Sequence, residues 1–86
     1  MPSYLVEIYL ARGSAGERTA CETHARAAAA QLTHVSFRRS IHIPEDEICF
    51  FVFDAPSRTD AAAAAQAAGL EPLRIVEAIT SDKEEQ

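Results

Sequence analysis

Two alanine-rich stretches, each lying between strand-like segments, constrain the fold of this chain more than any other feature. They occupy 27–30 and 61–68, and alanine has the highest helix propensity of all residues. We expect one helix to begin in the 12–17 segment and to end near Leu32, and a second to end at Gly69. Segments with the composition and alternation of strands lie around both helices, at 3–11, 35–43, 47–55 and 70–79.

The predicted order of elements is therefore β-α-β-β-α-β. With right-handed crossovers, this order is that of the split βαβ arrangement. We expect an α+β fold, a ferredoxin-like βαββαβ sandwich, in which four antiparallel strands form one sheet. Both helices should cover the same face of that sheet, and the first and third strands should lie in its middle.

The third strand is apolar on both of its faces, which raises the question of what covers the second one. The first strand has a wholly apolar face that we assign to the core, made of Tyr4, Val6, Ile8 and Leu10. From Ile48 to Phe53 no alternation is visible. We expect the face without helices to carry these residues: Leu5, Tyr9, Phe51, Phe53, Ile75 and Ile79. Such a face exceeds what a monomer usually exposes, so we expect a homodimer joined sheet to sheet, of the dimeric α/β barrel type.

Length and charge narrow the class of protein. The 86 residues fit a single domain, expected over 1–80 with a polar tail at 81–86. The net charge of −5 argues against nucleic acid as a partner, because that role needs clustered Lys and Arg. The same negative net charge argues against an anionic membrane surface as a partner. The N-terminus shows no export signal and the two cysteines are expected to be reduced thiols, which points to the cytoplasm.

A cleft between the two sheets is one candidate site. Glu7 and Glu77 fall on apolar strands that should be neighbours, and Arg39 could pair with one of them. Removal from water would raise the pKa of such carboxylates, as general bases require. The predicted cleft consists of Glu7, Tyr9, Arg39, Cys49, Phe51 and Glu77. The alternatives are an ion pair that only fixes the sheet register and a cysteine that is only a buried, inert thiol.

The second candidate site is a metal site at the turn between the second and third strands. His42 is followed by Pro44 and by the acidic residues Glu45, Asp46 and Glu47, and His34 lies nearby in the sequence. Imidazole and carboxylate groups bind divalent metals. Acidic turns that are merely solvated are the alternative.

Four segments of the chain resemble a known family. They are YLVE at 4–7, RSIHIPEDEICFFVFDAPS at 39–57, AAGL at 67–70 and RIVEAI at 74–79. These resemble a bacterial family of small ferredoxin-like proteins that is catalogued as a domain of unknown function and whose best-studied member binds nickel. The resemblance implies a ferredoxin-like fold, a homodimer and the binding of divalent nickel at the dimer surface.

Two functions of different classes follow from these observations. The first is a non-catalytic homodimer that binds nickel in a sequestration or sensing role. The second is a small cofactor-free enzyme or ligand-binding module, monooxygenase- or isomerase-like, that uses the cleft between the sheets.

Overall fold

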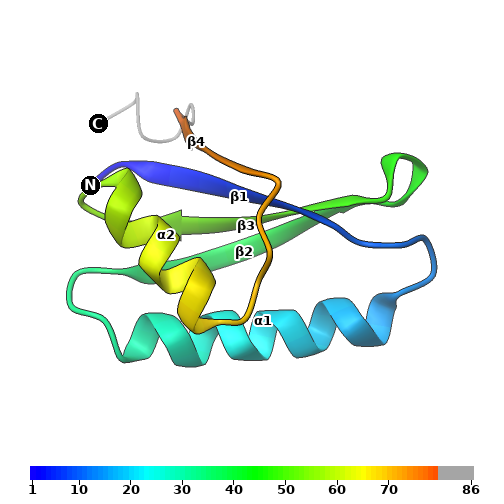
Figure 1. Ribbon diagram of the computed structural model, residues 1–86, viewed down its shortest axis with the longest axis horizontal. Coiled ribbons are helices and arrows are strands. Elements are labelled where there is room, and N and C mark those ends of the chain that lie inside the picture. Colours follow the sequence, from blue (N-terminus) through cyan, green and yellow to red (C-terminus); the bar gives the residue numbers. More distant parts are fainter. Residues whose placement is uncertain (80–86) are drawn as a thin grey trace.

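The structure, a computed structural model, describes residues 1–79 and has the predicted order of elements (Figure 1). The predicted tail at 81–86 lies outside the described residues. Within residues 1–79, no helix is both long and apolar enough to cross a membrane. The elements are β1 (Ser3–Tyr9), α1 (Ala15–Ala30), β2 (Ser36–Ile43), the 3-10 helix η1 (Pro44–Asp46), β3 (Ile48–Asp54), α2 (Arg58–Ala67) and β4 (Arg74–Ala78).

The four strands form one antiparallel sheet in the order β2-β3-β1-β4. The first and third strands are therefore the central ones, as the sequence predicted. This order and the connections are consistent with the ferredoxin-like topology. Both helices pack into the same hydrophobic core, on one side of the sheet (Figure 1). We call this side the covered face and the opposite side the open face.

Alanine forms the helix side of the core. The buried helix residues are Ala25, Ala28 and Ala29 from α1 and Ala61, Ala64 and Ala65 from α2. They meet large side chains from the central strands, among which Val6, Phe51 and Phe53 have no exposed surface. Small side chains on the helices let them approach the sheet closely, so the aromatic rings of β3 fill the space between the layers.

The ends of the helices show which local signals determine the structure. Ser57 caps α2, because its Oγ accepts a hydrogen bond from the Asp60 backbone N–H at 3.2 Å. Gly69 has φ +75°, which is the left-handed conformation expected of a glycine that ends a helix. Ser14 is the N-cap residue of α1, but its side chain makes no capping hydrogen bond, although its spacing to Glu17 is that of a capping box.

The assignment of the faces of β3 is corrected by the register of the sheet. The core residues Val6 and Tyr4 lie directly opposite Phe51 and Phe53, and residues opposite one another in an antiparallel pair share a face. Phe51, Phe53 and Cys49 therefore point to the helices and not to the open face. Ile48, Phe50 and Val52 take the open face instead.

The predicted faces of β2 are wrong because the strand contains a β-bulge. The register shifts between Phe37 and Arg39, which removes the simple alternation along this strand. As a result, Phe37 packs against the core, whereas Arg39 lies opposite Val52 on the open face.

The predicted faces of β4, the last strand, are also wrong. Glu77 lies opposite Tyr4 and Ile75 opposite Val6, so both residues belong to the covered face. Val76 lies opposite Leu5 on the open face.

Candidate functional site

The open face is a regular grid of side chains from all four strands. Four cross-strand rows follow from the register. The row at one end is mainly polar and consists of Ser36, Asp54, Ser3 and Ala78, and the other three are mainly apolar. These three are Arg39, Val52, Leu5 and Val76; then Ile41, Phe50, Glu7 and Arg74; and then Ile43, Ile48 and Tyr9. Most of these side chains are apolar, and Tyr9 and Ile41 are 61% and 44% exposed. Contiguous apolar surfaces are typical of interaction sites in proteins.

Two guanidinium groups and one carboxylate interrupt the apolar grid. Arg74 Nε donates to Glu7 Oε1 at 2.7 Å, and the Glu7 side chain is 13% exposed while that of Arg74 is 66% exposed. On the opposite edge of the sheet, Arg39 is exposed and makes no ion pair with any residue in the described part of the chain. The open face thus carries one free positive charge.

The predicted cleft residues are divided between the two faces of the sheet. Glu7, Tyr9 and Arg39 lie together on the open face. Cys49 and Phe51 are fully buried under the helices, and Glu77 belongs to the covered face. The interpretation of Cys49 as a buried thiol therefore agrees with its location.

Burial makes Cys49 the less reactive of the two thiols. Desolvation raises the pKa of Cys49 from 9.0 to about 11, and the next largest influence, the Arg18 charge, opposes this shift. Below pH 9 the thiol is neutral in both the folded and the unfolded chain. In that range the neutral thiol makes its full contribution to the free energy of unfolding. That contribution is lost as the pH rises from 9 to about 11, because the unfolded chain ionises first.

A thiol-labelling experiment checks this difference. At pH 8, an exposed-thiol reagent should modify Cys21 well before Cys49, whose thiolate population is reduced roughly a hundredfold by the shift in pKa. Mass spectrometry of a labelling time course, with the Cys21→Ser variant as control, measures both rates. Equal rates for the two cysteines in the folded protein would show that Cys49 is accessible.

The residues predicted to bind metal are separated by the length of β2. His34 precedes this strand and the acidic residues Glu45 and Asp46 follow it. Eight strand residues at about 3.3 Å each put roughly 26 Å between the two ends, so His34 cannot share an ion with the turn. Within the described residues, no group of three or more His, Cys, Asp or Glu side chains is arranged to hold a metal ion.

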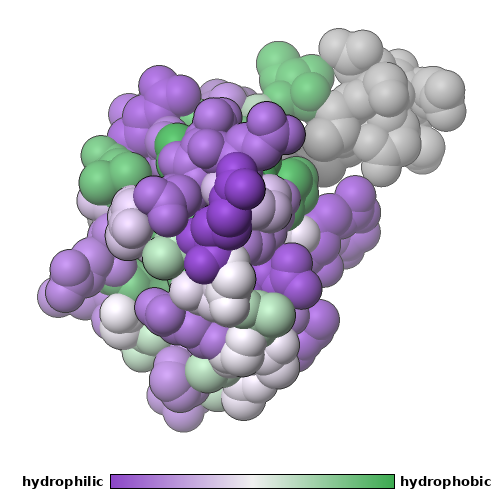
Figure 2. All heavy atoms as spheres, turned by 90° about the vertical axis from the view of Figure 1, so that its right-hand side faces the viewer, coloured by the Kyte–Doolittle hydropathy of each residue, from purple (hydrophilic) through white to green (hydrophobic). Residues whose placement is uncertain are grey.

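At the turn itself, the predicted ligands face different directions. His42 lies opposite Cys49, on the covered face, and its Nε2 is buried. Glu47 accepts a hydrogen bond from the Arg12 backbone N–H at 3.1 Å, while Glu45 and Asp46 are exposed. Figure 2 shows this end of the molecule, whose surface is mainly hydrophilic. The turn has the character of a solvated acidic loop.

Polar groups also lie beneath α1, near the edge of the covered face. Ser40 donates a hydrogen bond to Glu22 across the gap between β2 and α1. Two nitrogens, Arg18 Nε and His42 Nε2, are buried without a hydrogen-bond partner. Glu22 is thus engaged with the sheet, and it forms no ion pair with Arg26 one turn along α1.

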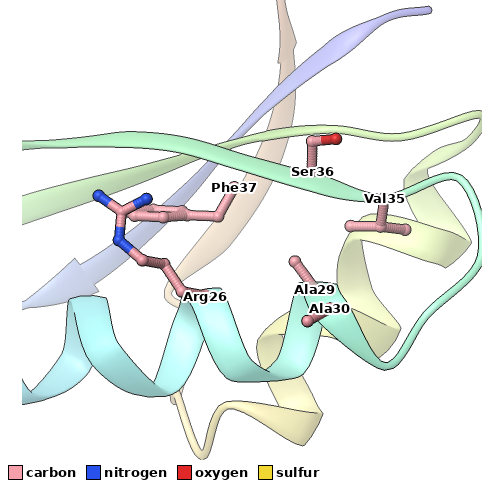
Figure 3. A pocket seen from close by; sticks show the side chains of 6 residues that line it. All are labelled: Arg26, Ala29, Ala30, Val35, Ser36 and Phe37. Atoms are coloured by element: carbon pink, nitrogen blue, oxygen red, sulfur yellow. The ribbon is translucent and has the colours of Figure 1, made fainter.

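Among the hollows on the surface of the described residues are two that the sequence did not predict. One, of about 300 Å³, lies near the start of α1 and is lined by Glu17, Cys21, Leu70 and Glu71 among others. The other, of about 320 Å³, lies between the second half of α1 and the start of β2 (Figure 3). It is lined by Arg26, Ala29, Ala30, Val35, Ser36 and Phe37.

No protein-family model, curated protein or solved structure matches this chain. The family resemblance seen in the sequence and the nickel binding that it implies therefore stay predictions. The functional argument rests on the geometry of the open face and of the surface hollows.

Proposed function

We propose that this protein is a homodimeric binding domain in which two open faces pack together and enclose a small polar molecule. The single observation that carries the proposal is the open face itself, an apolar grid with Glu7, Arg39 and Arg74 set into it. We also propose that the dimer works in the cytoplasm, in keeping with its two free cysteines.

The energetics of a small domain favour this association. A chain of this length buries only about 60–65% of the surface that its unfolded form exposes, and here both helices cover the same side of the sheet. A second open face would remove Tyr9, Ile41 and Phe50 from water, and each buried aliphatic or aromatic side chain contributes about 1.5–3 kcal/mol.

The charged groups on the open face favour the binding of a polar ligand between the two sheets. Burial of Arg39 without a partner would be costly, since a buried cation needs a compensating anion or hydrogen bonds. An anionic or strongly polar small molecule between the sheets would supply them, next to the Glu7–Arg74 pair. We propose binding and not catalysis, because no histidine or cysteine lies on the open face among the described residues to activate a nucleophile there.

Native mass spectrometry of Glu7→Gln and Glu77→Gln shows whether Glu7 binds a ligand or only forms an ion pair with Arg74 that fixes the register. Glu77→Gln is the matched control, because Glu77 belongs to the covered face. The wild-type dimer should carry the additional mass of a copurified small molecule, which Glu77→Gln should retain and Glu7→Gln should lose without dissociating. A wild-type dimer without additional mass would contradict the ligand, and a Glu7→Gln chain that becomes monomeric would assign the pair to the interface.

Nickel binding, which the resemblance implies, makes a separate prediction. The resemblance predicts that calorimetry of metal-stripped protein shows saturable binding of nickel, with a whole number of ions per dimer, and that His42→Ala abolishes it. His34→Ala is the control, since His34 lies at the other end of β2. Absence of heat with nickel, zinc and copper would contradict this prediction and leave the proposed dimer untouched.

A further inference from the structure

The hollow between α1 and β2 is chemically distinct from the open face. It is lined by one cation and no carboxylate, in a chain with 13 acidic and 8 basic residues. Its apolar wall consists of Ala29, Ala30 and Val35 (Figure 3). The hollow is shallow and largely open to solvent, with a volume of about 320 Å³.

Phe37 forms the floor of this hollow and holds the cation in place. Its ring packs against Phe51 and Phe53, with centroids 6.1 and 5.4 Å away, so it is anchored in the core. The Arg26 guanidinium carbon lies 5.0 Å from the centroid of the same ring, and Figure 3 shows the guanidinium close to the ring. A cation–π contact of this kind holds the guanidinium near the ring without using its N–H donors.

The donors of Arg26 have no anionic partner in the described part of the chain. Glu22, one turn earlier on α1, accepts from Ser40 instead. A guanidinium with free donors matches a carboxylate, which it binds through two parallel hydrogen bonds.

The edge strand beside the hollow adds backbone groups to it. Within residues 1–79, β2 is an edge strand that pairs with β3 alone. Half of its backbone N–H and C=O groups therefore point away from the sheet. The Ser36 hydroxyl points away from α1 (Figure 3), so this residue borders the hollow with its main chain. The bulge after Phe37 turns that side chain toward α1 and leaves the strand edge irregular at this point.

We propose that this hollow binds a small carboxylic acid with a compact apolar body. The carboxylate of the ligand pairs with Arg26. Its apolar body lies on Phe37 and against the apolar wall. This inference is independent of the proposed dimer, because Phe37 packs on the covered face.

NMR titration of isotope-labelled protein with benzoate, at constant ionic strength, tests the proposal. The backbone amide signals of 29–37 should shift and saturate with benzoate, and should not move with benzylammonium, which has nearly the same shape and the opposite charge. Arg26→Gln should raise the dissociation constant at least about tenfold, as expected for loss of a charged hydrogen bond. Arg58→Gln, which removes an exposed guanidinium from α2, should leave it unchanged.

A second variant keeps the test decisive if Arg26→Gln disturbs the fold. Ala30 is exposed at the wall of the hollow, so Ala30→Leu should fill the space and weaken benzoate binding while α1 stays intact. The proposal is overturned if benzoate gives no saturable shifts at 29–37, if benzylammonium binds there equally well, or if both variants bind benzoate as the wild type does.

Discussion

Phe50→Arg should convert the protein from a dimer into a folded monomer. Phe50 lies in the middle one of the three apolar rows of the open face, between Ile41 and Glu7, so the new guanidinium would be buried in the interface. A charge without a partner at the centre of an interface costs about 3 kcal/mol or more, which raises the dimer dissociation constant at least about a hundredfold. Size-exclusion chromatography with light scattering measures the change directly.

Ala63→Arg is the matched control for this experiment. It introduces the same charge at an exposed position of α2, on the other side of the sheet, and should leave the dimer intact. Circular dichroism should show that both variants are folded. If Phe50→Arg elutes with the same mass as the wild type, the open face is not the interface.

Phe51→Ala should have the largest effect on the stability of a single chain. The Phe51 ring is fully buried between the sheet and both helices, and the removal of a buried Phe costs about 3–5 kcal/mol. A domain of this size has roughly 5–15 kcal/mol in total, so the variant should be close to unfolding. Urea denaturation in the Phe50→Arg background measures the free energy of unfolding without a contribution from the dimer.

Ile41→Ala in the same background compares a residue of the open face with Phe51 on the covered face. Ile41 is 44% exposed on the open face of the monomer, so its truncation should cost less than about 1 kcal/mol. Equal losses of stability for Phe51→Ala and Ile41→Ala would contradict the assignment of Phe51 to the covered face.

The order of the elements could be predicted from the sequence, but the faces of three strands could not. In β1, Glu7 breaks the apolar run and identifies the core face as Tyr4, Val6 and Ile8. In β3, every residue from Ile48 to Phe53 is apolar, so alternation contains no information, and a shift of one residue exchanges the two faces. Only the pairing of Val6 with Phe51 resolves the ambiguity.

The candidate sites were harder to predict because they depend on packing between distant residues. The bulge after Phe37 separates Arg39 from the core face, and no turn residue in the sequence indicates it. The contact between Arg26 and Phe37 joins a helix to a strand through their packing. The sequence suggests a different partner for Arg26, Glu22 at the usual helical spacing, which the structure pairs with Ser40.

Sedimentation equilibrium of the wild-type protein tests the central claim most directly. The open face predicts a species with twice the 9.3 kDa mass of one chain, which dissociates reversibly on dilution as a single monomer–dimer equilibrium. A mass of one chain at every concentration would contradict the proposed sheet-to-sheet dimer and, with it, a ligand held between the two faces.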